Sequence, residues 1–306
     1  MGVNLSVTFL GTGASWPTAE RGLSCVAVKR SGEVVLFDCG EGTQRQIQRS
    51  GLSYQQVTRI FLTHFHGDHC FGVPGLIKTM ALNERIGPLW IYGPRGLLRM
   101  ADAWRRMGGW TQQFPVHVQE LEPGGSVACD GYEVEVHAGD HRITNLVYAL
   151  QEPDRPGKFD KPRALELGVP EGPLFGRLQR GESVQLRDGR TVEPGMVLGA
   201  PRPGRRIVYS GDTQPCLGLL EAARDADLFV CEATFTKDLV ERAREVRHMC
   251  AEEAAAIALK AGARRLALTH ISPRYKDAAP VVEEARAVYA DAFVVQDFDE
   301  VEVPLR

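Results

Sequence analysis

The chain has 306 residues, of which 43% are hydrophobic and 25% are charged, with a formal net charge of −3. This composition is typical of a soluble globular protein, and its net acidity excludes a general attraction to nucleic acid, so such a partner requires a local basic patch. No stretch approaches the roughly 18 apolar residues of a membrane span, and the first residues lack a signal-peptide pattern. The seven cysteines form no CxxC pair, which suits a reducing compartment. We therefore expect a cytoplasmic protein that does not bind membranes.

Strands are predicted in the first third of the chain where β-branched and aromatic residues run between glycine and polar turns. These segments are 5–13, 24–30, 33–40, 59–64 and 88–94. Apolar residues at helical spacing predict two helices, at 75–83 and 96–108.

The segment 151–206 differs in composition from the rest of the chain. Its 56 residues hold 9 Gly and 8 Pro, which is 17 of 56, whereas the other 250 residues hold the remaining 33. It also carries 11 Lys and Arg against 8 Asp and Glu, a local net charge of +3. Such a segment is a poor core former, so we predict an arm with a small folded tip, inserted into a single domain of residues 1–306. A disordered insertion is the alternative.

Strand and helix patterns alternate after this segment. Strands are predicted at 205–213, 226–235 and 264–270. A helix at 248–263 has acidic residues in its first turn and Gly262 at its end, and a second helix is expected at 279–290. Strands at both ends of the chain with helices between them favour an α/β fold with two sheets over a single parallel sheet.

Four potential metal ligands stand within six residues at the end of the strand predicted at 59–64: His64, His66, Asp68 and His69. On a turn after a strand, two histidines two residues apart can bind one cation, and the following Asp and His can face a second. Imidazole and carboxylate without thiolate suit Zn²⁺ or a similar divalent metal. Because the whole chain has only 8 His, a chance cluster is a weaker explanation.

Three further candidate ligands each follow an apolar strand pattern: His141, Asp212 and His270. One such residue is more often a cap or turn residue. Three of them, together with the first cluster, favour a site with two metal ions at an edge where strands deliver side chains into a shared cleft. His117 fits a strand position and His137 a structural one.

These motifs resemble the metallo-β-lactamase superfamily: "THFHGDH" at 63–69, Gly-Asp-His at 139–141, "SGDT" at 210–213 and "THIS" at 269–272. Further segments narrow the resemblance to the ribonuclease Z family, endonucleases that trim tRNA 3′ ends, in the short bacterial form. They are "FLGTGAS" at 9–15, "FDCGEGTQRQI" at 37–47, "GPLFGRLQRGESVQLRDG" at 172–189, "CEATF" at 231–235 and "HISPRY" at 270–275. The superfamily implies an αββα sandwich with two zinc ions at the sheet edge.

The resemblance implies a role for each of these residues. His64, His66 and His141 would hold one zinc, Asp68, His69 and His270 the other, and Asp212 would bridge them. A catalytic histidine falls on His248, and the segment 151–206 corresponds to the protruding arm that grips tRNA. The family also implies a homodimer. It often has a histidine where this chain has Cys231, which leaves Glu232 as the possible partner of His248.

We expect this site to hydrolyse precursor tRNA with a hydroxide shared by the two zinc ions, leaving a 3′-hydroxyl on the tRNA and a 5′-phosphate on the trailer. Asp68 would accept the proton of the water, and His248, oriented by Glu232, would aid the departing oxygen. Candidate phosphate contacts on the arm are Arg177, Arg180, Arg187 and Arg190. Two alternatives are a small-molecule hydrolase on the same scaffold and a non-catalytic RNA-binding subunit.

Overall fold

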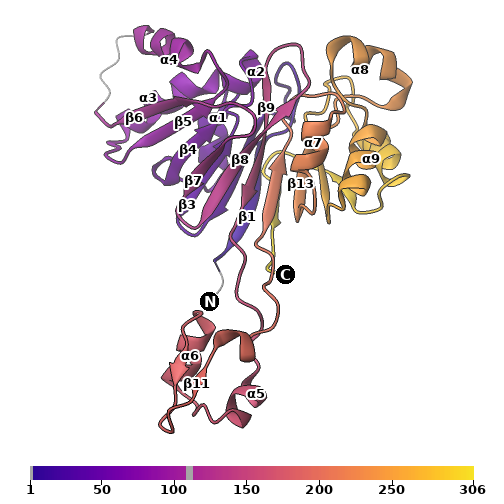
Figure 1. The fold of residues 1–306 in the computed structure, drawn as a ribbon. Helices are drawn as coiled ribbons and strands as arrows, with labels where there is room; N and C mark the ends of the chain where they lie inside the picture. The colour runs from indigo at the N-terminus through magenta and orange to yellow at the C-terminus, as the bar shows by residue number, and fades with distance from the viewer. Residues whose placement is uncertain (1–2, 108–112) are drawn as a thin grey trace. The chain divides into compact units, whose positions relative to one another are not determined.

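The computed structural model describes residues 3–107 and 113–306, and the chain divides into two units (Figure 1). The first unit comprises Met1–Gln151 and Arg206–Pro304, and the second comprises Glu152–Arg205 and Leu305–Arg306. Within the described ranges, no helix combines the length and the apolar character that a bilayer crossing demands.

Two seven-stranded sheets form the centre of the first unit. The strands of the first sheet, in spatial order, are β16 (Glu300–Glu302), β1 (Leu5–Gly11), β2 (Cys25–Arg30), β3 (Glu33–Phe37), β4 (Val57–Phe61), β5 (Leu89–Gly93) and β6 (Val116–Glu120). Those of the second sheet are β15 (Ala292–Val294), β14 (Leu266–Thr269), β13 (Leu228–Glu232), β12 (Arg206–Tyr209), β9 (Asn145–Gln151), β8 (Tyr132–Gly139) and β7 (Ser126–Cys129). The strands predicted from the sequence are confirmed.

Helices cover the outer face of each sheet (Figure 1). The first sheet carries α1 (Thr43–Ser50), α3 (Gly72–Leu82) and α4 (Leu97–Arg106), and the second carries α7 (Leu217–Ala222), α9 (Ala251–Ala261) and α10 (Ala279–Arg286). Shorter elements are α2 (Gly67–Cys70), α8 (Val240–Val246) and the 3₁₀ turns Tyr54–Gln56 and Lys237–Leu239. Gly108, the last residue of the predicted helix 96–108, lies outside the described residues.

Strand β3 illustrates why the layers form. Val34 and Leu36 pack under the helices, while Val35 and Phe37 point into the core between the sheets. A strand covered on both faces needs apolar residues at every position, which explains its unbroken apolar run. Aromatic rings join the two sheets: the ring centroids of Phe37 and Tyr148 are 5.9 Å apart. The resulting αββα sandwich confirms the predicted fold class.

Several predicted segments begin or end at other residues in the structure, and three of these differences bear on the candidate site. Strand β13 ends at Glu232 and β14 at Thr269, and His270 follows with a φ of 56° that leaves the strand conformation. Helix α9 begins only at Ala251, because Cys250 is its N-cap and forms a capping box with Glu253. His248 is therefore not helical and stands on the loop before α9.

The second unit has secondary structure and an apolar core of its own. It contains α5 (Lys161–Glu166), α6 (Pro173–Gln179), β10 (Val184–Gln185), β11 (Thr191–Val192) and the 3₁₀ turn Pro194–Met196. Its core consists of Ala164, Val169, Leu178, Val184, Leu186, Val192 and Val197. At the base of the unit Arg205 pairs through two hydrogen bonds, of 2.6 and 2.8 Å, with Glu152, and both side chains are buried.

Candidate metal centre

The candidate ligands meet because several strands end at the same edge. Strands β12, β13 and β14 are parallel, and β8 runs in the same direction because it is antiparallel to β9, which is antiparallel to β12. Their carboxyl ends carry or precede Asp212, Glu232, His270 and His141. The ends of such strands are where α/β sheets commonly present functional side chains.

The first sheet contributes the loop after β4. His64 and His66 stand on the irregular segment between β4 and α2, and His66 at its end has an extended backbone, with φ −67° and ψ 146°. The chain then turns into the one-turn helix α2, whose N-cap is His66, and this turn sends Asp68 and His69 in a different direction. The segment 64–69 can thus supply ligands to two neighbouring metal positions.

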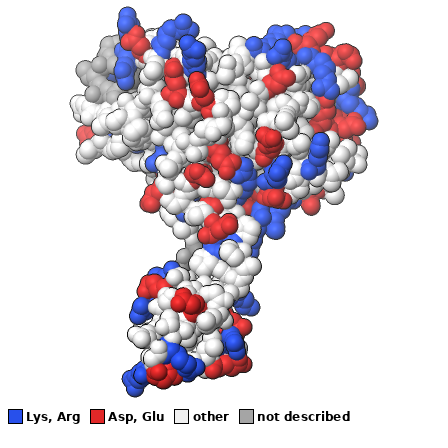
Figure 2. Space-filling view, in the orientation of Figure 1, with Lys and Arg blue, Asp and Glu red and all other residues white. Residues whose placement is uncertain are grey.

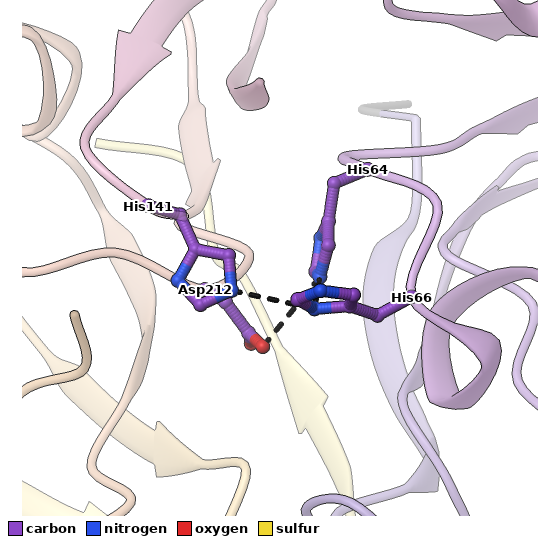
Figure 3. Close-up of side chains that lie close together, drawn as sticks. All are labelled: His64, His66, His141 and Asp212. Carbon is purple, nitrogen blue, oxygen red and sulfur yellow. Dashed lines mark hydrogen bonds and ion pairs between the residues drawn. The ribbon is translucent and has the colours of Figure 1, made fainter. Parts of the chain in front are cut away.

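One group of ligand atoms belongs to His64, His66, His141 and Asp212, whose side chains point toward one another (Figure 3). The Nδ1 atom of His66 lies 3.0 Å from Nε2 of His64 and 3.3 Å from Nε2 of His141. The Oδ2 atom of Asp212 is 3.6 Å from Nε2 of His64. One ligand atom from each residue lies within 4.8 Å of all the others.

A second group comprises Asp68, His69 and His270, and it adjoins the first through Asp212. The Nε2 atoms of His69 and His270 are 3.3 Å apart. Oδ1 of Asp212 is 3.2 Å from the former and 3.3 Å from the latter. Oδ2 of Asp68 lies 3.5 Å from Nε2 of His270. Asp212 therefore directs one oxygen to each group.

Burial and charge set the protonation of these side chains. Burial lowers the pKa of His64, His66 and His141, which favours the neutral imidazole that metal binding needs. Burial alone raises the pKa of Asp212, but the nearby histidines His270 and His69 outweigh it and keep the carboxyl ionised.

The donor set fits divalent metal ions. Among the residues that the structure describes, Oδ1 of Asp212 is a buried oxygen that accepts no hydrogen bond, which is costly unless a cation compensates it. Imidazole nitrogens and carboxylate oxygens without thiolate match the preferences of zinc and exclude the ligand sets typical of copper thiolate or iron–sulfur centres.

Hydrogen bonds behind the ligands orient four of the imidazole rings. Nδ1 of His64 donates to Oγ1 of Thr63 (3.0 Å), and Nδ1 of His270 donates to Oγ1 of Thr234 (2.9 Å). Nδ1 of His141 donates to the carbonyl oxygen of Arg247 (2.9 Å), and Nδ1 of His69 to Asp38 (2.6 Å). Each bond holds Nδ1 of that histidine away from the site, so Nε2 is the nitrogen that faces it.

Asp38, which lies in the motif at 37–47 but was assigned no role from the sequence, is the most connected of these partners. It is fully buried with a φ of 60°, and it accepts hydrogen bonds from His69, from Thr63 through backbone N and Oγ1, and from the hydroxyl of Tyr209 (2.8 Å). The signal that identified Asp212, a polar residue directly after an apolar strand, also applies to Asp38 after β3.

We expect Asp38→Asn to lower the affinity for a divalent metal ion by roughly 10- to 100-fold, the usual cost of removing a ligand's orienting partner. Asparagine has a single acceptor oxygen, so its amide group would face donors that now meet a carboxylate. Competition with a chelator measures the affinity, and thermal unfolding of the metal-free variant controls for a change in stability. An unchanged affinity would contradict the assigned role.

His248 and Glu232 form a pair at the edge of the ligand cluster. Nδ1 of His248 donates to both carboxylate oxygens of Glu232, at 2.9 and 3.1 Å, and its Nε2 lies 4.0 Å from Oδ2 of Asp212. Burial lowers the pKa of His248, but the carboxylates of Glu232 and Asp212 outweigh burial and raise it to about 9. Buried Glu232 also accepts bonds from the backbone of Thr213 and Met249.

Other residues noted in the sequence lie away from these groups. Cys231 is buried in the core between the second sheet and its helices, so a side chain at this position faces that core. His117 stands on β6 and stacks on Trp90, and His137 on β8 contacts Glu135.

The four arm arginines lie in the second unit, and all of them are exposed. Arg177 and Arg180 both pair with Glu182, at 3.0 and 2.9 Å, and Arg190 pairs with Asp188 at 2.7 Å. Solvent-facing pairs of this kind contribute little to stability, so another anion can displace the carboxylate.

The family model of the metallo-β-lactamase superfamily matches residues 20–270. A ribonuclease Z of Myxococcus xanthus is 51% identical over 304 residues, covering 99% of both chains. A ribonuclease Z of Methanosarcina acetivorans is 46% identical over 303 residues, again covering 99% of both. The crystal structure of the short form of human tRNase Z superposes with a TM-score of 0.72 at 28% identity, covering 98% of this chain and 100% of the human chain.

Proposed function

The chain belongs to the ribonuclease Z family of the metallo-β-lactamase superfamily, and we propose that it acts as a zinc-dependent tRNA 3′-processing endoribonuclease. In this reaction it would remove the 3′ trailer of precursor tRNA by hydrolysis. The observation that carries the proposal is the convergence of seven nitrogen and oxygen ligands beside the His248–Glu232 pair, in a chain with this family's sequence along nearly its whole length. The expected products are a 3′-hydroxyl on the tRNA and a 5′-phosphate on the trailer.

In this proposal the first group of ligands would hold one zinc ion, Asp68, His69 and His270 would hold the other, and Asp212 would serve both. When bound, the two ions supply a hydroxide at neutral pH and offset the negative charge of the phosphodiester. The N/O ligand set supports zinc, although Mn²⁺ binds similar ligands, and metal analysis of the purified protein decides between them.

Asp68 is the group we propose as proton acceptor. Its carboxylate is less enclosed than that of Asp212, with 12% of the side chain exposed against 3%. Oδ2 accepts the backbone N–H of Ser15 (2.8 Å) and faces His270. Contacts with His270 and His69 outweigh burial and hold the pKa of Asp68 below its ordinary value, so the carboxylate is ionised and can orient a water. We propose that it accepts the proton of that water.

His248 is the group we propose to assist the departing oxygen. Glu232 accepts its Nδ1–H, so any proton that His248 transfers is carried on Nε2, the nitrogen that faces Asp212. The carboxylate also stabilises the protonated ring, whose raised pKa supports a role as proton donor at neutral pH. The 3′ oxygen of the tRNA would receive this proton as the bond to phosphorus breaks.

Incubation with a 3′-extended tRNA transcript, followed by mapping of both product ends, tests the function. Cleavage at the junction with the stated ends supports it. Faster hydrolysis of a cyclic nucleotide than of the transcript would favour the small-molecule hydrolase instead. Bound zinc near two ions per chain, with RNA binding and no turnover of either substrate, would favour the non-catalytic alternative.

We also propose that the second unit binds the body of the tRNA. Basic and acidic side chains are interspersed on its visible surface (Figure 2). The four arginines are exposed, and Arg177, Arg180 and Arg190 pair with neighbouring carboxylates. An RNA phosphate can replace Glu182 or Asp188 as the partner of these arginines, and each such contact releases counterions from the RNA.

Replacing Arg177, Arg180, Arg187 and Arg190 together by glutamine is expected to weaken binding of precursor tRNA. The dependence of log K on log salt concentration should become shallower by roughly 0.7–0.9 for each phosphate that the variant no longer neutralises. Binding titrations at several salt concentrations measure both effects. Arg106→Gln is the matched control, because Arg106 is an exposed arginine on α4 paired with Asp102 at 2.7 Å. If the slope of log K against log salt concentration is the same for the quadruple variant and the wild type, these arginines do not contact RNA phosphates.

We also propose that the protein is located in the cytoplasm and forms a homodimer. The substrate class supports the location, and the family resemblance supports the dimer, in which the second unit of one subunit could hold tRNA for the site of the other. Light scattering with and without tRNA tests the dimer.

A further inference from the structure

An exposed tryptophan lies directly beside the candidate metal centre without a role in it. Trp16 is 62% exposed, although its indole is among the largest apolar side chains. The preceding residue, Ser15, has a φ of 66° and donates its backbone N–H to Oδ2 of Asp68 (2.8 Å). Trp16 is thus one residue away from a direct contact with a candidate ligand.

The loop that carries Trp16 is held firmly at its base. A single carboxylate, that of Asp297, accepts the backbone N–H groups of Thr12 (3.1 Å) and Gly22 (2.7 Å), the two ends of the loop. It also accepts the side chains of Thr12 and Gln46, both at 2.7 Å. Gly13 and Gly22 are joined by a backbone hydrogen bond of 2.9 Å.

The loop is also attached to the segment that carries His270. Backbone N–H of Ala14 donates to the carbonyl oxygen of Ile271 (3.1 Å), and that of Ile271 donates to Thr12 (2.9 Å). The loop therefore contacts the loop of Asp68 on one side and that of His270 on the other. A rigid loop that presents an exposed indole at this place is preorganised to receive a ligand.

We propose that Trp16 is a stacking platform for the nucleobase next to the scissile phosphodiester. This inference rests on the proposed function, because that reaction brings the sugar-phosphate chain to the ligand cluster and carries the adjoining bases over the segments around it. Aromatic side chains recognise unpaired RNA by stacking, which tolerates any base. Trp16 would in this way position the substrate in the register that is cut, without touching the reacting atoms.

Abasic substrates and Trp16 variants together test the stacking. The substrates are 3′-extended tRNAs that are intact or carry one abasic nucleotide, on the tRNA side or on the trailer side of the junction. Trp16→Ala is expected to lower kcat/KM on the intact substrate by about 10- to 100-fold, and an abasic nucleotide at the stacked position should lower the wild-type value similarly. The abasic penalty is the decrease in kcat/KM that the abasic nucleotide causes relative to the intact substrate. This penalty should disappear in Trp16→Ala, and most of it should return in Trp16→Phe.

Ile86→Ala is the matched control. Ile86 is 86% exposed and precedes β5, at the edge of the first sheet opposite to the ligand cluster, and this variant should retain both the rate and the abasic penalty. A merely structural role of Trp16 would lower the rate on intact and abasic substrates equally and would overturn the proposal. So would an abasic penalty that persists in Trp16→Ala but disappears in a variant of Phe71, another exposed aromatic near the cluster. Failure of the wild type to cut any 3′-extended tRNA would instead reject the proposed function.

Discussion

His66→Ala is expected to abolish zinc binding and endonuclease activity together. His66 contributes Nδ1 at a point 3.0 Å from His64 and 3.3 Å from His141, so its removal opens one side of the first group. A metal that supplies several kcal/mol of transition-state stabilisation corresponds to a fall in rate of more than about a thousandfold. Elemental analysis and cleavage of a 3′-extended tRNA measure the two effects on the same preparation.

His117→Ala provides the control for this prediction. His117 is an exposed histidine on β6 that stacks on Trp90, and its removal should change neither zinc content nor rate. His66→Ala that keeps both zinc ions and the wild-type rate would remove this residue from the ligand set. Wild-type protein that takes up no zinc would reject the metal centre altogether.

His248→Ala is expected to keep its zinc and to slow cleavage of precursor tRNA by about 10²- to 10⁴-fold, the usual contribution of one acid–base group. A ligand atom of His248 also lies within 4.8 Å of those of Asp212 and His270, but the two groups proposed to hold the zinc ions draw their ligand atoms from other side chains. The metal content should therefore stay near that of the wild type. Because Glu232 is buried and would no longer have the positively charged partner that His248 provides, a decrease in stability is also expected. Thermal unfolding with zinc present measures that cost separately.

The leaving group distinguishes a proton donor from a residue that only shapes the site. A chromogenic nitrophenyl phosphodiester releases an oxygen that needs little protonation, so His248→Ala should slow it much less than it slows RNA cleavage. Equal decreases on both substrates would contradict the proton-donor role. Glu232→Gln should show the same preference in a weaker form, because glutamine can still accept the Nδ1–H but no longer stabilises the charged ring.

The fold could be predicted largely from local patterns. Buried strands such as β3 read as apolar runs because both their faces are covered, and α9 reads as a helix from its acidic first turn and its terminal Gly262. The ends of elements beside the site were predicted less well. The strand predicted through His270 ends at Thr269, because the chain leaves the ladder to turn this imidazole into the cluster.

The sequence alone predicts the chemistry of the site. Histidine and aspartate residues that follow apolar strands identify the candidate ligands, and the motifs around them identify the family. Their arrangement depends on the packing of two sheets. Only the folded chain places Oδ1 and Oδ2 of Asp212 toward different groups, positions Asp38 behind His69, and attaches the loop of Trp16 to Asp68. The physical reason is that sequence periodicity reports which face and which end of a strand a residue occupies. Distances between residues remote in the chain are set by tertiary packing, and that packing leaves no local pattern.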